Sequence, residues 1–280
     1  MTHLDVRDAI MLRLGENAIF GLVPRGPVVR IARSMERWGD AEREVWASGW
    51  LASYGVRVCE TVDMAQPIPV SGHPVTFWQY IDGRRGRPED VYQLGTLLRN
   101  IHSLEQPVSA NALLPRFDPL GRVAARIACA PICEADRISL SESLARISVE
   151  IEALEFQLPV TIIHGDAHVQ NLMVPKGGDP VLIDLENISI GQPEWDLSVT
   201  ATEWQVAGFW SDDQYQSFVD GYGFDVTTWP GFQVIKQAQA IKMTTWLMQN
   251  INESQEIRDE YELRMRTIRD GEPLRCWTPF

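Results

Sequence analysis

Two short apolar runs, NLMV and VLID, lie close together in the second half of the chain. Between them stands the segment PKGGDP, and proline and glycine in such a segment favour a reversal of the chain. The runs therefore predict an antiparallel hairpin, whose simplest register pairs Val174 with Val181. In that register Asn171 lies opposite Asp184, with the two Cβ atoms about 5 Å apart.

A hairpin of this kind brings an amide oxygen and a carboxylate to one place. Hard cations such as Mg²⁺ prefer oxygen ligands and take few of them from protein, so Asn171 and Asp184 are candidate metal ligands. Because side chains alternate along a strand, Met173 and Leu182 share the face of these two residues, and we expect one of them to line the floor of a nucleotide pocket. Asp166 precedes Asn171 by five residues and is placed to accept a proton from an attacking hydroxyl.

The order of these polar residues is similar to one found in kinases. Residues 164–171 read H-G-D-x-x-x-x-N and are followed by I-D-x-E, which matches the kinase pattern H-R-D-x-x-x-x-N and its later metal-binding Asp, with Gly in place of Arg. Residues 161–186 resemble the phosphotransfer core of the aminoglycoside phosphotransferase family, the antibiotic and choline kinase branch of the protein-kinase-like fold. The segment GQPEWDLSV resembles a further motif of that family, G-x-P-x-x-D-L-A, and residues 15–105 resemble it more weakly.

The resemblance implies a role for each matching residue. Asp166 is the expected catalytic Asp, and Asn171 and Asp184 are the expected Mg²⁺ ligands. Asp196 is expected to brace the catalytic loop, and His164 to help hold it. Phosphoryl transfer needs mainly positioning and neutralisation of phosphate charge, so one base and two metal ligands at rigid strand ends are sufficient.

The hydrophobic pattern changes along the chain. Residues 15–83 alternate short β-type runs with one helix, whereas the helical period dominates afterwards. One face of the first later helix carries Val91, Leu94, Leu98 and Ile101. We therefore expect an α+β, two-lobed protein-kinase-like fold, with a β-rich nucleotide-binding lobe at residues 1–82 and a mostly helical lobe at 83–280 that holds the catalytic loop and the substrate site. The hairpin is expected to stand alone in the helical lobe, and a ligand to bind in the cleft between the lobes.

The amino-terminal half offers candidate nucleotide contacts. Arg30 interrupts an apolar run and Glu42 begins a helical segment, which resembles the family's strand cation and helix glutamate, although a purely structural ion pair is the other interpretation. The family usually has Lys at the strand position, and Arg33 and Glu44 are the next candidates. The segment FWQYIDG resembles the hinge whose backbone binds the purine of ATP or GTP, and the backbone near Glu16 falls where a loop covers the phosphates. The expected nucleotide contacts are Asn17, Arg30, Glu42, Gln79, Tyr80, Ile81 and Ile183.

The expected acceptor is a small molecule with a hydroxyl group. The chain has 25 basic and 38 acidic residues, a net charge of −13, which disfavours nucleic acid and favours cationic or neutral molecules unless it serves solubility alone. An antibiotic is the first expectation, and choline, a sugar or an amino alcohol is the alternative. The expected acceptor contacts are Glu186, Glu194, Glu203 and Trp204, with Trp210 and Trp246 as further aromatic candidates. Acids that would suit a cationic acceptor are Glu203, Asp212, Asp213, Asp220 and Asp225.

Two functions of other classes are also open. One is a nucleotide-binding regulator without transfer, against which the intact Asp166, Asn171 and Asp184 argue. The other is a zinc hydrolase, because His164 and His168 stand four residues apart; that spacing needs a helix, which the glycine between them disfavours.

Location and redox state follow from what the sequence lacks. No apolar segment approaches the roughly 18 residues that span a bilayer, and MTHLDVRDAIMLRLG has no apolar core of signal-peptide length, so a cytoplasmic location without a membrane partner is expected. The four cysteines form no C-x-x-C pair, and buried free thiols are expected rather than disulfides or zinc ligands.

Overall fold

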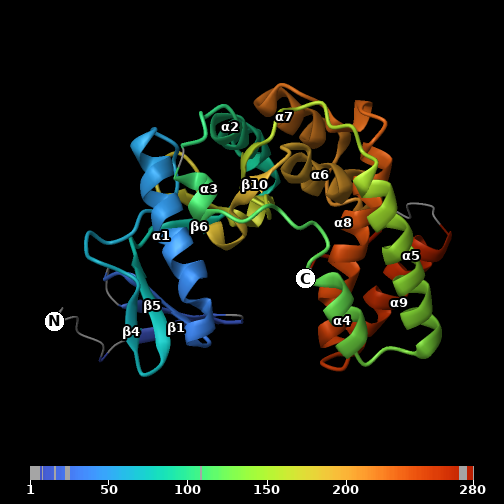
Figure 1. Ribbon diagram of the computed structural model, residues 1–280, viewed down its shortest axis with the longest axis horizontal. Coiled ribbons are helices and arrows are strands. Elements are labelled where there is room, and N and C mark those ends of the chain that lie inside the picture. Colours follow the sequence, from blue (N-terminus) through green and yellow to red (C-terminus); the bar gives the residue numbers. More distant parts are fainter. Residues whose placement is uncertain are drawn as a thin grey trace.

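The computed structural model describes residues 7, 9–15, 17–22, 26–107, 109–270 and 276–279 of the chain. Glu16, whose backbone was expected near the phosphates, and seven of the first eight residues, which belong to the segment tested above as a signal peptide, lie outside them. A sheet with one long helix forms one side of the molecule and a mostly helical part forms the other, with α2 and the strands near it between them (Figure 1). This two-lobed arrangement confirms the predicted α+β fold class.

The amino-terminal lobe is a five-stranded antiparallel sheet in the order β1-β2-β3-β5-β4. Its strands are β1 (Ala9–Leu14), β2 (Asn17–Leu22), β3 (Val28–Ala32), β4 (Ile68–Val70) and β5 (His73–Trp78). After the single turn η1 (Met35–Arg37), helix α1 (Trp38–Ser53) packs against β5. The buried residues of α1 are Ala41, Glu44, Ala47, Ser48 and Leu51. Since these positions share one face of the helix, α1 turns Glu44 inward and leaves Glu42 exposed.

A three-stranded sheet follows the hinge and carries the predicted hairpin. Its order is β6-β8-β9, with β6 at Gly83–Arg85, β8 at Leu172–Pro175 and β9 at Val181–Leu182. The prediction that the hairpin stands alone is therefore wrong. The pairing of β6 with β8 depends on Gly83, because a Cβ there would lie 2.1 Å from the carbonyl oxygen of Val174.

The hairpin register also differs from the prediction, by one residue. Leu172 pairs with Leu182 and Met173 pairs with Val181. This register turns both leucines into the core, where neither is accessible to solvent, so the core selects it over the one expected from the turn. The expectation that Leu182 lines a pocket is wrong for the same reason, whereas Met173 does line the cleft.

The carboxy-terminal lobe is mostly helical. Its remaining elements are η2 (Pro88–Asp90), α2 (Val91–His102), α3 (Ala110–Leu113), α4 (Val123–Cys129), α5 (Glu134–Glu152), β7 (Thr161–Ile163), η3 (Val169–Asn171), η4 (Leu185–Asn187), β10 (Ser189–Gly191), α6 (Glu194–Thr202), the π-helix η5 (Glu203–Ala207), α7 (Asp212–Tyr222), η6 (Val226–Thr228), α8 (Phe232–Leu247), η7 (Met248–Asn250) and α9 (Gln255–Asp270). The predicted apolar face of α2 is confirmed, since Val91, Leu94, Leu98 and Ile101 are all buried. It packs mainly against α7 and β7.

Two further expectations meet different outcomes. None of the helices in the described ranges combines the length and the apolar character needed to cross a bilayer. The expectation of buried thiols is wrong for Cys129, Cys133 and Cys276, which are exposed, while Cys59 is half-buried.

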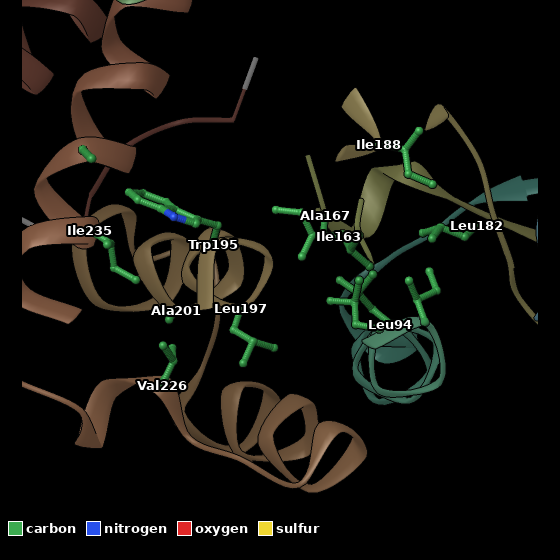
Figure 2. Close-up of a cluster of buried hydrophobic side chains, with 14 of the residues drawn as sticks. Leu94, Ile163, Ala167, Leu182, Ile188, Trp195, Leu197, Ala201, Val226 and Ile235 are labelled. Atoms are coloured by element: carbon green, nitrogen blue, oxygen red, sulfur yellow. The ribbon is translucent and has the colours of Figure 1, made fainter. Parts of the chain in front are cut away.

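One hydrophobic core runs through the molecule and supports the loop that follows β7. Figure 2 shows Leu94 of α2, Ile163 of β7 and Leu182 of β9 packed together, and none of the three is accessible to solvent. The same cluster includes Ala47 and Leu51 of α1, so the core continues from one lobe into the other. The division of the chain at residues 82 and 83 stays a prediction.

Candidate active site

A cleft of about 1530 Å³ separates the two lobes and takes side chains from both. The predicted site residues that line it are Asn17, Arg30, Gln79, Tyr80, Ile81, Asp166, Asn171, Ile183, Asp184, Glu186 and Glu203. The predicted residues that do not line it are Glu42, His164, Glu194, Asp196 and Trp204. The structure therefore brings most of the expected residues to one cavity.

Asp196 holds the start of the predicted catalytic loop, which follows β7 and begins at His164. One carboxylate oxygen of Asp196 accepts from the backbone N–H of His164 at 2.7 Å and the other from that of Gly165 at 2.8 Å. His102 of α2 approaches the first oxygen with Nε2 at 3.1 Å. Although burial acts to raise the pKa of Asp196, the contacts with His102 and His164 outweigh it and lower that pKa. Asp196 is thus a buried carboxylate whose charge is matched by its neighbours.

Gly165 and His164 fix the shape of the loop. Gly165 has φ +82, and a Cβ there would lie 2.3 Å from the carbonyl oxygen of Asn187, so glycine is required both by its backbone angle and by close packing. His164 has Nε2 3.0 Å from the carbonyl oxygen of Ile183, and its Nδ1 accepts from the backbone N–H of Asp166 at 3.3 Å. These partners assign the proton to Nε2. His164 therefore ties the loop to the segment that follows β9 and leads to Asp184.

Asp166 lies three residues before the turn η3, and Asn171 is the last residue of that turn. Asn171 is buried, and its Nδ2 donates to the carbonyl oxygen of Asp166 at 2.9 Å, which leaves the amide oxygen as its other polar atom. The Asp166 side chain is 47% exposed and faces the cleft, with His168 Nε2 3.8 Å from its carboxylate. The backbone N–H of Ile183 donates to the carbonyl oxygen of Asn171, so the residue before Asp184 lies beside Asn171.

Asp184 combines a left-handed backbone with a buried carboxylate oxygen that lacks a hydrogen-bond donor among the described residues. Its φ of 64 and ψ of 62 place it in the left-handed region, which costs a non-glycine residue about 1 kcal/mol or more. Its Oδ1 is buried and has no hydrogen-bond donor among the described residues; the nearest cation is Arg30, whose Nη1 is 3.7 Å away. Carboxylate oxygens of Glu44, Asp184 and Glu186 all lie within 4.8 Å of one another. An orphaned carboxylate oxygen in an acidic cluster fits a divalent cation.

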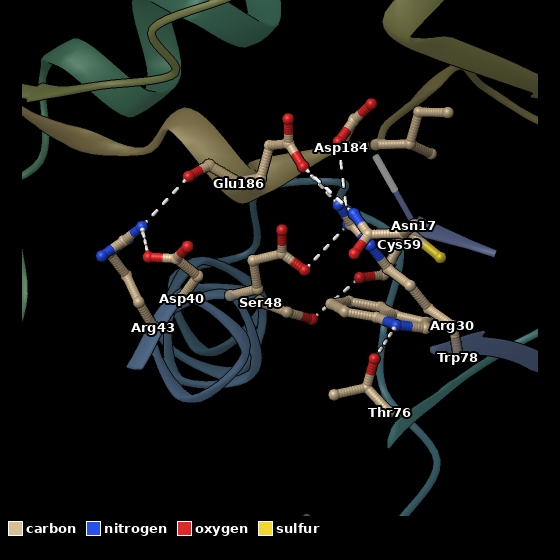
Figure 3. A network of polar contacts seen from close by, with 12 residues as sticks. Asn17, Arg30, Asp40, Arg43, Ser48, Cys59, Thr76, Trp78, Asp184 and Glu186 are labelled. Atoms are coloured by element: carbon tan, nitrogen blue, oxygen red, sulfur yellow. Dashed lines mark hydrogen bonds and ion pairs between the residues drawn. The ribbon is translucent and has the colours of Figure 1, made fainter. Parts of the chain in front are cut away.

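Arg30 is the centre of a charged network at the base of the amino-terminal sheet (Figure 3). Its Nη1 lies 2.9 Å from Glu44 and its Nη2 lies 2.5 Å from Glu186. The predicted pairing of Arg30 with Glu42 is wrong, because two helical positions turn a side chain by about 200° and α1 buries the face of Glu44. Asn17 closes the network: with its amide oxygen turned toward Arg30, it accepts from Nη2 at 2.5 Å and Nε at 3.0 Å.

The network holds more acid than base. Burial acts to lower the pKa of Arg30, but Glu44, Asp184 and Glu186 outweigh it and raise that pKa. Burial raises the pKa of Glu44 to about 8, in spite of Arg30, and the charges of Glu186 and Asp184 act in the same direction as burial. One guanidinium therefore does not neutralise three carboxylates, and a further cation suits this place.

The hinge residues Gln79, Tyr80 and Ile81 line the same cleft. The backbone N–H of Gln79 is already used, since it donates to the carbonyl oxygen of Glu60 at 2.8 Å. Any purine contact from this residue must therefore come from its carbonyl oxygen or its side chain.

The predicted acceptor residues fall into two groups. Glu203 and the aromatic candidates Trp210 and Trp246 line the cleft, and Glu203 accepts from Trp210 Nε1 at 3.0 Å. Burial raises the pKa of Glu203 to about 7; the hydrogen bond from Trp210 opposes this and the charge of Asp166 adds to it. The acceptor role predicted for Glu194 is wrong, because Glu194 is fully buried and accepts from the backbone N–H groups of two loop residues at 2.7 Å each.

Trp204 is also misplaced by the prediction. Its indole donates to Asp212 at 2.9 Å and stacks on Tyr215 with ring centroids 4.3 Å apart, away from the cleft. It belongs to the π-helix η5, in which one extra residue per turn changes the direction of successive side chains. Glu203 therefore points to the cleft while its neighbour does not.

Several residues of the cleft carry no signal in the sequence. Phe117, Arg126, Gln239 and Lys242 line the half of the cleft that lies away from the amino-terminal sheet, and Pro279 joins them from the end of the chain. The described part of that end is held in place, because Arg264 donates to the carbonyl oxygen of Thr278 at 2.7 Å and its guanidinium lies 4.8 Å from the Trp277 ring. A lysine between apolar neighbours in α8 was the one available hint.

Comparisons with known proteins agree with this geometry. No curated protein sequence matches the chain significantly. Among solved structures, the amicoumacin kinase hAmiN in complex with AMP-PNP, Ca²⁺ and Ami has a TM-score of 0.78 at 14% identity, covering 99% of this chain and 92% of that one. A microcompartment-associated aminopropanol kinase has a TM-score of 0.71 at 14% identity, covering 96% and 94%. The choline kinase LicA from Streptococcus pneumoniae has a TM-score of 0.69 at 16% identity, covering 96% and 95%.

These likenesses show a kinase-like fold. The sequence itself matches the family model described as the phosphotransferase enzyme family over residues 22–235, which is well over half of the 280 residues. The chain therefore belongs to the phosphotransferase enzyme family.

Proposed function

We propose that this phosphotransferase moves the γ-phosphoryl group of ATP or GTP to a hydroxyl of a small molecule, with Mg²⁺ as the metal. The observation that supports it most is the orphaned Asp184 carboxylate oxygen, which lies beside Arg30 in the same cleft as a braced, half-exposed Asp166. Base, metal ligand and strand cation thus share one cavity.

Each residue has a distinct task in this proposal. Asp166 accepts the proton of the acceptor hydroxyl, and the loop that Asp196 clamps keeps its carboxylate in position. Asp184 and the amide oxygen of Asn171 hold the metal, and Arg30 contacts the phosphates while Glu44 fixes its guanidinium. The metal, when bound, neutralises charge on the phosphate oxygens. Rigid placement of these groups supplies most of the catalysis expected for phosphoryl transfer.

The acceptor belongs to one of two classes. An antibiotic is the first expectation from the family resemblance, and the amicoumacin kinase structure supports it. An amino alcohol or choline is the second, supported by the aminopropanol and choline kinase structures. The cleft volume of about 1530 Å³ gives room for the donor together with an acceptor of either class.

The experiment is transfer of labelled γ-phosphate from ATP and, separately, from GTP to a panel of hydroxyl-bearing antibiotics and metabolites. Asp166→Asn is expected to lower kcat by about 10²- to 10⁴-fold while Mg²⁺-dependent nucleotide binding is retained, because the variant loses only the base. Asp213→Asn, an exposed acid of α7 outside the cleft, is the matched control. Full turnover by Asp166→Asn refutes the assignment of the base, and a wild-type chain that binds no nucleotide refutes the proposed function.

A further inference from the structure

Lys242 is a cation in the wall of the cleft that has no anionic partner among the residues the structure describes. It lies on α8, and its Nζ is 5.5 Å from the centroid of the Phe117 ring. In the described part of the chain, neither a carboxylate nor a carbonyl oxygen accepts a hydrogen bond from this ammonium or forms an ion pair with it. A half-buried ammonium loses hydration, and a ring face replaces only part of it. An anion in the cleft would offset the remainder.

The charges around Lys242 point in the same direction. Burial lowers the pKa of Lys242 and the charge of Arg126 adds to this, while Asp166, Asp196 and Asp118 act to raise it. The charge of Arg126 thus disfavours the ammonium form of Lys242, and an anionic ligand beside Lys242 would favour that form. Of these acids, Asp196 is enclosed by its own hydrogen bonds, and Asp118 accepts from the backbone N–H of Leu120 at 3.1 Å.

The basic character of this wall extends beyond one pair. Cations of the loop before α4 and of α4 itself also line the cleft there: Arg116, Arg122 and Arg126. Helices α4 and α8 contact each other on the side of the molecule that faces the amino-terminal sheet (Figure 1). In a chain of net charge −13, a cluster of cations at a ligand site runs against the average composition.

Four of the five acids that would suit a cationic acceptor lie outside the cleft, and only Glu203 lines it. Asp212, Asp213 and Asp220 belong to α7 and do not line the cleft. Asp225 accepts from the hydroxyl of Tyr215 at 2.8 Å and from Thr227, so it caps η6. Of these five acids, only Glu203 could therefore face a cationic acceptor, and burial raises its pKa, which favours the neutral form.

We propose that the acceptor carries an oxyanion, a carboxylate or a phosphate monoester, in addition to the hydroxyl that is phosphorylated, and that Lys242 binds this oxyanion with Arg126 nearby. Phe117 packs against the carbon skeleton between the two groups. This inference rests on the proposed function, since it names the class of acceptor for the same cleft. It adds a specificity-determining residue on α8 that faces the catalytic loop from the opposite wall.

The test compares matched acceptors that differ only in the anionic group. Hydroxy acids are paired with their amides, and sugar phosphates with the parent sugars, and kcat/KM for phosphate transfer is measured for each pair. The wild-type chain is expected to prefer the anionic member of the carboxylate or the phosphate series by about 10- to 100-fold, the range of a charge-assisted hydrogen bond. The preferred series identifies which oxyanion is bound.

Three variants test whether Lys242 causes the preference for anionic acceptors. Lys242→Met is expected to raise KM for the anionic members about 10- to 100-fold and to leave the neutral members unchanged, and Lys242→Arg to restore part of the preference. Lys236→Met, six residues earlier on α8 and outside the cleft, is the matched control and should behave as wild type. Equal loss on anionic and neutral acceptors, or a wild-type chain that prefers neutral or cationic acceptors, overturns the inference.

A binding measurement separates this inference from the proposed function. Titration of Asp166→Asn with the anionic and neutral compounds reports acceptor binding without transfer. In one outcome, the wild-type chain transfers phosphate to no acceptor, yet anionic compounds bind selectively and Lys242→Met abolishes this binding. That outcome refutes the proposed function and supports the oxyanion site. Transfer that is unaffected by Lys242→Met supports the proposed function and refutes the oxyanion site.

Discussion

Glu203 makes the stability of the fold depend on pH in a way that one substitution removes. Glu203 is the first residue of the π-helix η5, and its carboxyl accepts a hydrogen bond from Trp210 Nε1 at 3.0 Å. Burial raises its pKa from the ordinary 4.5 to about 7, so between these values the folded chain keeps a proton that the unfolded chain releases. The free energy of unfolding therefore falls as pH rises through this window. The full difference corresponds to about 3 kcal/mol at 1.36 kcal/mol per pH unit.

The substitution Glu203→Gln keeps an oxygen for the Trp210 indole and removes the titration. Urea unfolding of both proteins at about pH 5.5 and about pH 8 is the assay. Over that interval wild type is expected to lose about 2 kcal/mol relative to the variant, because part of the difference has already developed below pH 5.5. Glu142→Gln, an exposed residue of α5, is the control and should follow wild type. Parallel pH dependence of wild type and Glu203→Gln would refute the reasoning.

Two further substitutions test the loop and the charged network. Gly165→Ala is expected to lower the free energy of unfolding by about 2 to 4 kcal/mol and kcat at least tenfold, because it adds left-handed strain and a contact of 2.3 Å with Asn187. The control is Gly177→Ala, where φ is +72 and no atom lies within 4 Å of the added Cβ; it should lose only about 1 kcal/mol and no activity. Arg30→Met is expected to cost about 3 to 5 kcal/mol and to weaken nucleotide binding, since it leaves Glu44 buried without its cation, whereas Arg33→Met should stay within about 0.5 kcal/mol of wild type. Equal stabilities in either pair, measured by urea unfolding, would contradict these accounts.

The loop from His164 to Asn171 could be located from the sequence because its information is local. His164, Asp166 and Asn171 lie within eight residues, and their spacing alone resembles that of kinases. The residue that braces the loop, Asp196, lies in a second local motif. Neither motif depends on knowing how distant segments pack.

The errors arose where packing selects between equivalent local patterns. A turn that contains two glycines allows both the predicted hairpin register and the observed one, which differ by one residue. Burial of both Leu172 and Leu182 selects the observed register. Likewise Glu42 and Glu44 are both acids near the start of a helix, and the buried face of α1 selects Glu44. The spacing of residues in the sequence does not determine which face of a hairpin or helix packs against the core.

The acceptor half of the cleft could not have been assembled from the sequence. Phe117, Glu203 and Lys242 are separated by about 40 residues or more along the chain and come from a loop, a π-helix and an α-helix. They meet only because α8 packs against α4 and α6. Their residue types carry no signature at any fixed spacing, so only the fold reveals them.

If the acceptor carries an oxyanion as proposed, the net charge of the chain is a poor guide to it for a physical reason. Charges more than about 8 Å apart are largely screened at physiological ionic strength, so the acids of α7 contribute little inside the cleft. Within the cleft the carboxylates of Glu44, Asp184 and Glu186 gather around Arg30 on the proposed donor side, whereas Lys242 and Arg126 lie with Glu203 on the proposed acceptor side. A metal-bound nucleotide needs acids as ligands, and an anionic acceptor needs cations opposite them. In this proposal the acid cluster therefore favours the metal-bound nucleotide at one wall, and Lys242 favours an anionic acceptor at the other.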